Sequence, residues 1–303
     1  MATKLRARDP KLVQPGKCKG LLFGASGAGK TWHALSFPVP YLIDTEGGAN
    51  KRHYQAKLKE AGGAYMGPED GSLNFDTILE EVRTLATERH PYKSLVVDSI
   101  TKLYQTDIAN EAERLGAKDA FGASKKPAIA NMRRLVARIA RLDMNVWFIA
   151  HEVAEWGMVD GQRQEVGRAP DVWDKIVYEL DLTLQVKKIG KGQREAFVFK
   201  SRLTGFPEFD RFYLQQNGAD VGYANFAERY GKDYIEAEPE PIVLASAEQV
   251  AEIKRLLEVV RVSEADIEKI LSKANAEAWD EVTEEQAAKT IDWLAGKVRK
   301  ESA

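Results

Sequence analysis

The chain has 303 residues, of which 44% are hydrophobic and 30% are charged, and its formal net charge is −2. These values are ordinary for a globular protein; the single cysteine, Cys18, excludes an intrachain disulfide, and no His/Cys cluster has metal-site spacing. No apolar run approaches the roughly 20 residues of a membrane span, and the basic residues 1–16 lack the apolar stretch of a secretory signal. We therefore expect a cytoplasmic protein with no membrane partner.

The charge is distributed unevenly along the chain. Residues 1–235 carry a positive balance, whereas residues 236–303 are acidic overall. A basic core permits a polyanionic partner, but this excess is smaller than the one that dedicated nucleic-acid-binding proteins show. Charge alone therefore does not decide between partners.

Short apolar or β-branched runs alternate with longer helical patterns from residue 19 to residue 235. This alternation predicts βαβ units around a mainly parallel sheet, and hence an α/β fold. Between Asp98 and Val146, the later part of the segment repeats apolar residues with a period of about 3.6, which indicates a helix. The expected strands are Gly20–Phe23, Pro40–Asp44, Leu95–Asp98, Val146–His151, Leu180–Lys187 and Ala196–Arg202.

The C-terminal part of the chain has a different character. Residues 236–243, with the sequence EAEPEPIV, are acidic, contain proline and show no periodicity, which is typical of a linker. Helical patterns follow it, and each begins after a capping residue: Ser246, Ser263 or Thr283. The predicted organisation is a basic N-terminal arm over residues 1–18, a core domain over 19–235, the acidic linker over 236–243 and a small helical domain over 244–303.

The sequence GASGAGKT directly follows the first expected strand and precedes a helical pattern. It matches the G-x-x-x-x-G-K-[ST] loop, whose glycines let backbone N–H groups turn toward phosphate. Lys30 would bring a positive charge to the β and γ phosphates, and the Thr31 hydroxyl suits Mg²⁺. We therefore predict that ATP and Mg²⁺ bind here. The predicted nucleotide-binding residues are Gly24, Ala25, Ser26, Gly27, Ala28, Gly29, Lys30 and Thr31.

Two carboxylates at the ends of expected strands are candidates for the chemistry of hydrolysis. Asp98 ends the apolar run SLVVD, as a Walker B carboxylate that holds Mg²⁺ through water would, although an Asp there can also simply cap the next turn. Glu46 follows the second strand, and the glycines after it let its carboxylate point back toward a γ-phosphate to orient or deprotonate the attacking water. The alternative is that Asp44 and Glu46 decorate a solvated turn.

Three segments in order, GASGAGKT, YLIDTEGGA and SLVVDSITKL, resemble the core of the RecA family of ATPases. The resemblance covers about residues 19–215 and is closest to short phage-encoded RecA-like ATPases associated with single-strand annealing. It implies a RecA-like P-loop NTPase core, with Glu46 as the catalytic carboxylate and Asp98 as the Walker B residue that binds the metal together with Thr31.

The resemblance also implies roles for residues whose own pattern is weak. His151 ends the expected strand WFIAH, where RecA-like proteins carry a polar γ-phosphate sensor; bacterial RecA has Gln there, and a lone strand-end histidine can instead be structural. Lys200 and Arg202 resemble the Lys-x-Arg finger pair of the DnaB and RadA branches, which reaches a neighbouring subunit's nucleotide. The other interpretation is a solvent-facing pair on an edge strand. The predicted catalytic residues are Glu46, Lys30, His151, Lys200 and Arg202.

Two stretches correspond, by this resemblance, to the loops that touch single-stranded DNA. They lie near residues 116–127 and 155–175 and combine cations, aromatics and glycines, which suits contact with phosphates and stacked bases. Acidic neighbours favour the simpler interpretation of solvated loops. The predicted DNA-binding residues are Arg163, Arg168, Trp156, Lys125 and Lys126. A solvated helix face is expected to carry Arg133, Arg134, Arg138 and Arg141.

The leading hypothesis is a homo-oligomeric, DNA-dependent ATPase, as a ring or a filament, that acts on single-stranded DNA in phage recombination or annealing. In that case the protein lies in the host cytoplasm, and its helical domain could dock a single-strand-binding protein. A nucleotide-switched assembly protein that binds no nucleic acid is the first alternative. A P-loop kinase is the second, although no acceptor-substrate domain is evident in the sequence.

Overall fold

The computed structural model describes residues 16–119, 122–274 and 276–301, so most of the predicted N-terminal arm lies outside the described residues. The chain divides into two compact units. The first unit holds the residues up to 78, 91–136 and 143–239, and the second holds 79–90, 137–142 and the chain from 240 onward. The division after residue 239 falls inside the predicted linker, and the second unit also takes in two short segments from the predicted core.

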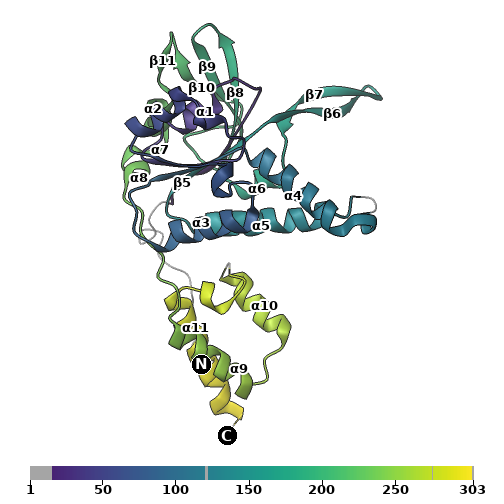
Figure 1. Cartoon of the computed structure of the whole chain (residues 1–303), viewed down its shortest axis with the longest axis vertical. Coiled ribbons are helices and arrows are strands. Elements are labelled where there is room, and N and C mark those ends of the chain that lie inside the picture. Colours follow the sequence, from purple (N-terminus) through teal and green to yellow (C-terminus); the bar gives the residue numbers. More distant parts are fainter. Residues whose placement is uncertain (1–15, 120–121, 275, 302–303) are drawn as a thin grey trace. The chain divides into compact units, whose positions relative to one another are not determined.

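One large sheet forms the centre of the first unit (Figure 1). Among the described residues it has nine strands in the order β11-β10-β9-β8-β1-β5-β4-β2-β3. Neighbours from β8 to β3 pair in parallel, whereas β8 to β11 pair in antiparallel fashion. The strands are β1 Lys19–Phe23, β2 Pro40–Asp44, β3 Ala64–Met66, β4 Ser94–Asp98, β5 Asn145–Ala150, β8 Leu182–Gly190, β9 Gln193–Ser201, β10 Arg211–Gln216 and β11 Ala219–Asp220.

The α/β fold with a mainly parallel sheet is therefore confirmed. Every strand expected from the sequence is present, with ends that differ by no more than three residues. The central strands were detectable because a parallel strand covered on both faces is a continuous apolar run, and β5 is buried along its whole length. Gly20 leaves room for this packing, since a Cβ there would lie only 2.2 Å from the Trp147 ring.

Helices connect the strands of the first unit. Those that lie wholly within it are α1 Lys30–Ala34, α2 Arg52–Glu60, α4 Ile100–Leu115, α6 Ile176–Glu179, α7 Gly222–Tyr230 and α8 Lys232–Glu236. Short 3₁₀ turns cover Gly48–Asn50, Pro68–Asp70 and Gly116–Lys118. Aromatic rings fill one part of the core: the Phe37 ring lies 5.1 Å from that of Trp147 and 5.0 Å from that of Phe226. Such edge and tilted contacts contribute beyond the apolar area they bury.

The carboxyl ends of β1, β2, β4 and β5 meet at one edge of the sheet. Phe23 pairs with Ala150, and Asp44 pairs with Asp98, so these strands end at the same level. Ligands of open α/β sheets bind in the crevice outside the carboxyl ends of the strands. The segments that leave these four strands therefore surround one crevice.

The stretch near residues 155–175 is not the loop that the sequence analysis expected. It is mostly an antiparallel hairpin of β6 Glu152–Val159 and β7 Gln162–Pro170, which extends away from the large sheet (Figure 1). The turn consists of Asp160 and Gly161, with φ angles of 50° and 78°. This is the Asp-Gly pair that two-residue hairpin turns favour. In the stretch near 116–127, Lys125 and Lys126 form the start of a helix, α5 Lys125–Arg141, and residues 120–121 lie outside the described part.

Capped helices dominate the second unit. They are α9 Ala247–Val259, α10 Glu264–Lys273, a 3₁₀ turn Trp279–Glu281 and α11 Glu284–Glu301, together with the end of α3 Phe75–Thr87 and the end of α5. The expected caps are in place: Gln249 N donates to Ser246 Oγ and Gln286 N donates to Thr283 Oγ1, each at 3.2 Å. Among the described residues, no helix combines the length and apolar character of a membrane span.

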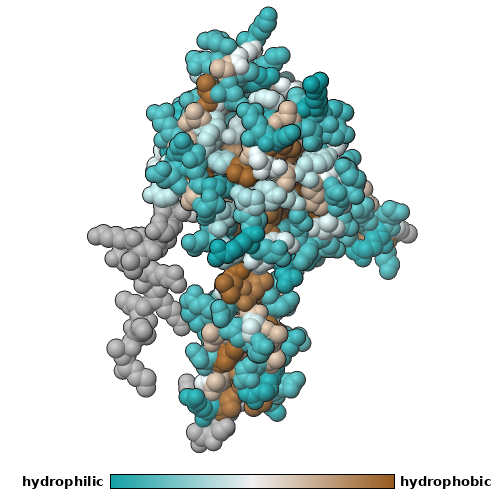
Figure 2. All heavy atoms as spheres, turned by 60° about the vertical axis from the view of Figure 1, so that its left-hand side comes forward, coloured by the Kyte–Doolittle hydropathy of each residue, from teal (hydrophilic) through white to brown (hydrophobic). Residues whose placement is uncertain are grey.

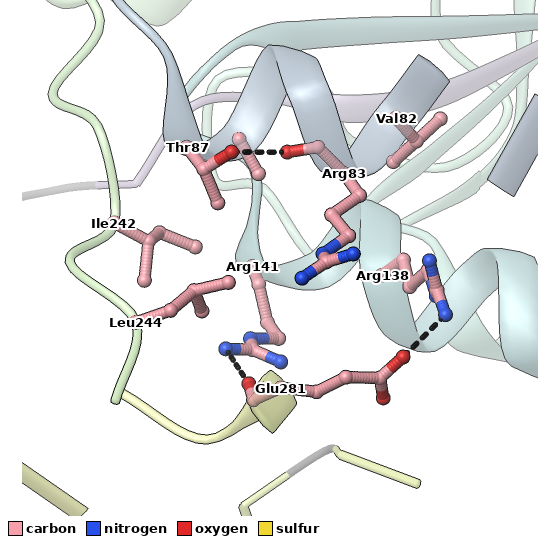
Figure 3. Close-up of a pocket in the computed structure, with 9 residues that line it drawn as sticks. Val82, Arg83, Thr87, Arg138, Arg141, Ile242, Leu244 and Glu281 are labelled. Carbon is pink, nitrogen blue, oxygen red and sulfur yellow. Dashed lines mark hydrogen bonds and ion pairs between the residues drawn. The ribbon is translucent and has the colours of Figure 1, made fainter. Parts of the chain in front are cut away.

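Arg138 and Arg141 do not lie on a solvated helix face, contrary to expectation. Within the second unit, both contact Glu281 beside a small apolar pocket that Ile242 and Leu244 also line (Figure 3). Arg138 Nη2 donates to Glu281 Oε1 at 2.5 Å, and Arg141 Nη2 donates to the Glu281 carbonyl oxygen at 2.8 Å. The surface that is visible in Figure 2 is mainly hydrophilic.

Candidate nucleotide-binding site

The loop between β1 and α1 turns through glycines with positive φ angles, 148° at Gly24, 73° at Gly27 and 102° at Gly29. Glycine adopts such angles with little strain because it has no Cβ. A Cβ at Gly24 would lie 2.4 Å from the carbonyl oxygen of Val186, and one at Gly29 would lie 2.8 Å from the Arg194 side chain. Both end glycines of the motif are therefore needed for the backbone path and for close packing.

The Lys30 side chain is buried against this loop. Its Nζ donates hydrogen bonds to the carbonyl oxygens of Gly24, at 2.7 Å, and of Ala25, at 3.0 Å. Burial lowers the pKa of Lys30, and the negative charge of Asp98 partly opposes this shift. A cation that is held by neutral carbonyls in a hollow can exchange them for phosphate oxygens, with which it makes stronger, charge-assisted bonds.

Thr31 and Asp98 place two oxygen donors side by side. The Thr31 hydroxyl donates to Asp98 Oδ2 at 2.5 Å. The pKa of Asp98 is raised to about 6 in all, mainly by burial and also by the charges of Glu46 and Asp44, while the hydrogen bond from Thr31 opposes the rise. No cluster of His, Cys, Asp and Glu among the described residues could hold a metal alone. A hydroxyl and a carboxylate fit Mg²⁺, which takes its other oxygens from phosphates and water.

Asp44 fixes the turn that follows β2. Its side chain is only 2% exposed; Oδ1 accepts from the backbone N–H groups of Glu46 and Gly47, both at 3.0 Å, and Oδ2 accepts from Ala49 at 2.7 Å. A carboxylate that satisfies three backbone donors holds a loop far more firmly than a solvated side chain would. Asp44 therefore determines where the Glu46 carboxylate can point.

Glu46 contacts two polar side chains that directly follow the neighbouring strands β4 and β5. Ser99 Oγ donates to Glu46 Oε1 at 2.7 Å, and His151 Nε2 lies 2.7 Å from the same oxygen. The His151 backbone is fixed in turn, because its N–H donates to Thr101 Oγ1 at 2.9 Å. Glu46 and His151 are 40% and 50% exposed, so the carboxylate is oriented yet open to water. This combination suits a group that accepts a proton from a water molecule.

One cavity of about 560 Å³ lies at the carboxyl edge of the sheet. Its volume is in the range of ligand pockets. Its lining includes residues 24–27 of the phosphate loop, Lys30, Thr31, Asp44, Glu46, Asp98 and His151. It also includes Tyr54, Glu152 and Arg168, which the sequence analysis did not place at the nucleotide.

A comparison with family models now adds to this geometry. A model described as an AAA domain matches residues 16–203, which is more than half of the chain. The chain belongs to this AAA domain family. Nucleotide binding by a P-loop and ATPase activity as its general class follow from that membership. A comparison with curated proteins finds no match.

The AAA domain brings together some of the predicted catalytic residues and separates others. Lys30, Glu46 and His151 line the cavity, whereas Lys200 and Arg202 do not. Ser201 pairs with Leu182, which pairs with Gly20 near the amino end of β1, so this pair lies at the sheet edge opposite the phosphate loop. Lys200 Nζ donates to the Leu180 carbonyl and Arg202 Nη2 to the Tyr178 carbonyl. Burial, reinforced by the charge of Arg202, lowers the pKa of Lys200.

The predicted DNA-binding residues of the AAA domain also fall into separate places. Trp156 and Arg163 are diagonal neighbours on the two strands of the β6–β7 hairpin, with the guanidinium carbon 5.6 Å from the indole centroid, and Trp156 is 55% exposed. Lys125 and Lys126 are exposed at the start of α5. Arg168 instead lines the nucleotide cavity at the base of the hairpin.

The hairpin has a readable signal that the expected loop does not take into account, the Asp160-Gly161 pair of a two-residue turn. Ser99 directly follows the strand-end Asp98 in the sequence, but its hydrogen bond to Glu46 is not predictable from that position. The positions of Glu152 and Arg168 depend on the hairpin register, in which Arg168 lies opposite Ala154, and no local pattern predicts that.

Proposed function

We propose that this AAA domain protein is a homo-oligomeric ATPase whose hydrolysis is coupled to single-stranded DNA, in phage recombination or annealing. The observation that carries the proposal is the connection between His151 and the β6–β7 hairpin. His151 contacts Glu46 in the nucleotide cavity, and the hairpin with its exposed Trp156 begins at the next residue. A change at the nucleotide therefore has a short path to a surface that suits stacked bases.

In the proposed reaction, the phosphate loop and Lys30 bind the triphosphate and stabilise the charge that builds up on it. Glu46, which is oriented by Ser99 and His151, accepts a proton from the water that attacks the γ-phosphate. Thr31 and Asp98 would hold Mg²⁺, which supplies charge neutralisation to the β and γ oxygens. Asp44 keeps the Glu46 turn fixed, so little reorganisation is needed when the water attacks.

The location of Lys200 and Arg202 supports an oligomer. Both cations lie at the sheet edge away from the nucleotide cavity of their own chain, so they cannot serve that cavity without a large rearrangement. A neighbouring subunit that docks its cavity against this edge would receive them as fingers. Each finger would replace its present backbone carbonyl partner with phosphate oxygens.

The hairpin also supports a second function, a nucleotide-switched assembly protein. Its exposed side chains include Met158, which is 71% exposed, and Val166, which is 51% exposed. Apolar groups of this kind suit contact with protein at least as well as contact with a nucleic acid. In this alternative, ATP controls the contact between subunits, and no DNA binds.

Filter binding of a labelled single-stranded oligonucleotide, with ATP present, distinguishes the two functions. The DNA-coupled ATPase should bind the oligonucleotide, lose affinity as salt rises from 50 to 200 mM (a range chosen to expose phosphate contacts), and hydrolyse ATP faster when DNA is added. An assembly protein should show no retention at either salt concentration, while its sedimentation changes with ATP. ATP turnover that is indifferent to DNA, together with no retained oligonucleotide, would contradict the proposal.

A further inference from the structure

Arg168 lies on β7 at the base of the hairpin and lines the nucleotide cavity. Among the cavity-lining residues that the structure describes, Lys30 and Arg168 are the cations. The same lining contains four carboxylates: Asp44, Glu46, Asp98 and Glu152. Even with Mg²⁺ at Thr31 and Asp98, a second protein cation in this cavity would help to offset the charge of a triphosphate.

The position of Lys30 leaves phosphate oxygens farther from the loop for a second cation to bind. Lys30 is bound to the carbonyls of Gly24 and Ala25 within the phosphate loop, so its reach is toward the phosphates nearest that loop. Arg168 lines the cavity from the hairpin, as does Glu152, the first residue of β6, which directly follows His151. A guanidinium can bind two oxygens of one phosphate through parallel N–H donors, which an ammonium cannot do.

Arg168 is held only weakly by its present partner, Glu165. Its Nη2 lies 3.0 Å from Glu165 Oε1 on the same strand, and the two side chains are 45% and 41% exposed. An ion pair in such contact with water contributes little, because solvent screens it and both side chains lose freedom. A phosphate inside the cavity would compete with Glu165 at small cost.

We propose that Arg168 binds the γ-phosphate of ATP in its own chain and releases Glu165 when it does so. The inference rests on the proposed ATP function and adds the means by which the site distinguishes ATP from ADP. It also ties both hairpin strands to the nucleotide, β6 through His151 and β7 through Arg168. The hairpin would then be held in one position with ATP and released with ADP.

The test compares nucleotide affinities in the absence of DNA. Binding of a non-hydrolysable ATP analogue and of ADP, each with Mg²⁺, is measured by calorimetry for the wild type, Arg168→Ala and Arg168→Lys. Arg114→Ala is the matched control, because Arg114 also pairs with a Glu three residues earlier, Glu111, but does not line the cavity. We expect Arg168→Ala to weaken the ATP analogue by about 10- to 100-fold, since a charged hydrogen-bonding partner is lost, with ADP affinity within twofold of wild type. Arg168→Lys should lie between wild type and Arg168→Ala.

Retained ADP affinity shows that the Arg168 variants are folded. If they are not, Glu165→Gln provides the second test: it frees Arg168, and should strengthen binding of the ATP analogue but not of ADP. Equal weakening of both nucleotides by an Arg168→Ala protein that far-UV circular dichroism shows to be folded, or no weakening of either, overturns the proposal. Because DNA is absent, failure of the DNA-coupled function leaves this result unaffected. A wild type that binds neither nucleotide would instead refute the ATPase proposal itself.

Discussion

The nucleotide cavity and the β6–β7 hairpin meet at His151 but are stabilised in different ways. In the cavity, Asp44 satisfies three backbone donors and Lys30 is buried against backbone carbonyls. In the hairpin, β6 and β7 form a two-stranded sheet of their own among the described residues, and large side chains such as Trp156 are exposed. The backbone around the cavity is thus fixed by buried hydrogen bonds, whereas the hairpin lacks such supports and presents exposed side chains to a partner. Changes in the two regions should therefore have separable effects.

The largest effect is expected in the cavity. Lys30→Ala should abolish tight ATP binding or turnover, because the site loses the cation that its loop holds for the phosphates. Nucleotide affinity and steady-state hydrolysis measure this, with Lys254→Ala, an exposed lysine of α9, as the control. If both quantities stay within twofold of wild type, the phosphate-loop assignment is wrong and the contrast between cavity and hairpin loses its basis.

A third region, the edge that carries Lys200 and Arg202, extends the comparison to a neighbouring subunit. Arg202→Ala should lower hydrolysis by about 10³-fold if the side chain neutralises charge at a neighbour's γ-phosphate. Mixing this variant with Glu46→Gln tests whether the finger acts between subunits. Arg202→Ala has an intact cavity but no finger, and Glu46→Gln has an intact finger but an inactive cavity. Activity above the sum of the separate variants indicates action between subunits. No gain at any ratio removes the finger role.

Glu46→Gln should separate binding from chemistry inside the cavity. The amide keeps the shape of the side chain but cannot accept the proton of water, so ATP should bind while hydrolysis falls by roughly a hundredfold or more. Single-turnover hydrolysis measures the chemical step, and calorimetry measures binding. Reduced binding with unchanged turnover per bound ATP would mean that Glu46 only supports the structure through Ser99 and His151.

The hairpin should respond in DNA affinity. Replacing Trp156 and Arg163 together with Ala should weaken single-stranded DNA binding by roughly tenfold or more, since a stacked base contributes about 1–3 kcal/mol. The logarithmic salt slope should also flatten by up to about 0.7, the contribution of one phosphate contact. Affinity titrations at several salt concentrations measure both. A variant that binds DNA as the wild type does would move the DNA contact elsewhere and favour protein as the hairpin's partner.

The same contrast explains what the sequence could predict. The parallel strands and the phosphate loop were predictable, because buried strands must be apolar runs and positive φ angles at Gly24 and Gly29 demand glycine. The partners of Glu46 were not, since they depend on which strands become neighbours: Asp44 pairs with Asp98, which brings Ser99 beside the Glu46 turn. Arg138 bonds to Glu281, a residue that lies 143 positions away in the sequence, and no local pattern predicts such a contact.

The hairpin was missed for a different reason. Its cations and glycines matched the composition of a loop, and this outweighed the Asp160-Gly161 turn between residues that can pair. The consequence was that Arg163 and Arg168 were treated alike. Their positions on the hairpin separate them, one beside Trp156 and the other in the nucleotide cavity.

The smallest expected effect concerns stability and pH. The pKa of Asp98 is raised to about 6 in the folded protein, mainly by burial. The folded state therefore binds the Asp98 proton more tightly than the unfolded chain does. The contribution of this proton to the free energy of unfolding is complete below pH 3.8 and is lost as the pH rises through about 6. Without Mg²⁺ and nucleotide, Asp98→Asn should raise the free energy of unfolding at pH 7 by about 1–2 kcal/mol, because it removes a poorly solvated charge. Urea unfolding at pH 7 measures the gain.

The same measurement at pH 4 to 5, chosen to lie below the raised pKa, should show a smaller difference between Asp98→Asn and wild type, because Asp98 is then largely protonated. Asp210 provides a control of opposite sign: its hydrogen bond from Arg229, at 2.6 Å, lowers its pKa, so Asp210→Asn should destabilise the protein at pH 7. Added Mg²⁺ with nucleotide should reverse the Asp98 result, since only the wild type keeps the carboxylate that the cation needs. A gain that is the same at both pH values would show that the Asp98 charge is not the cause of the added stability.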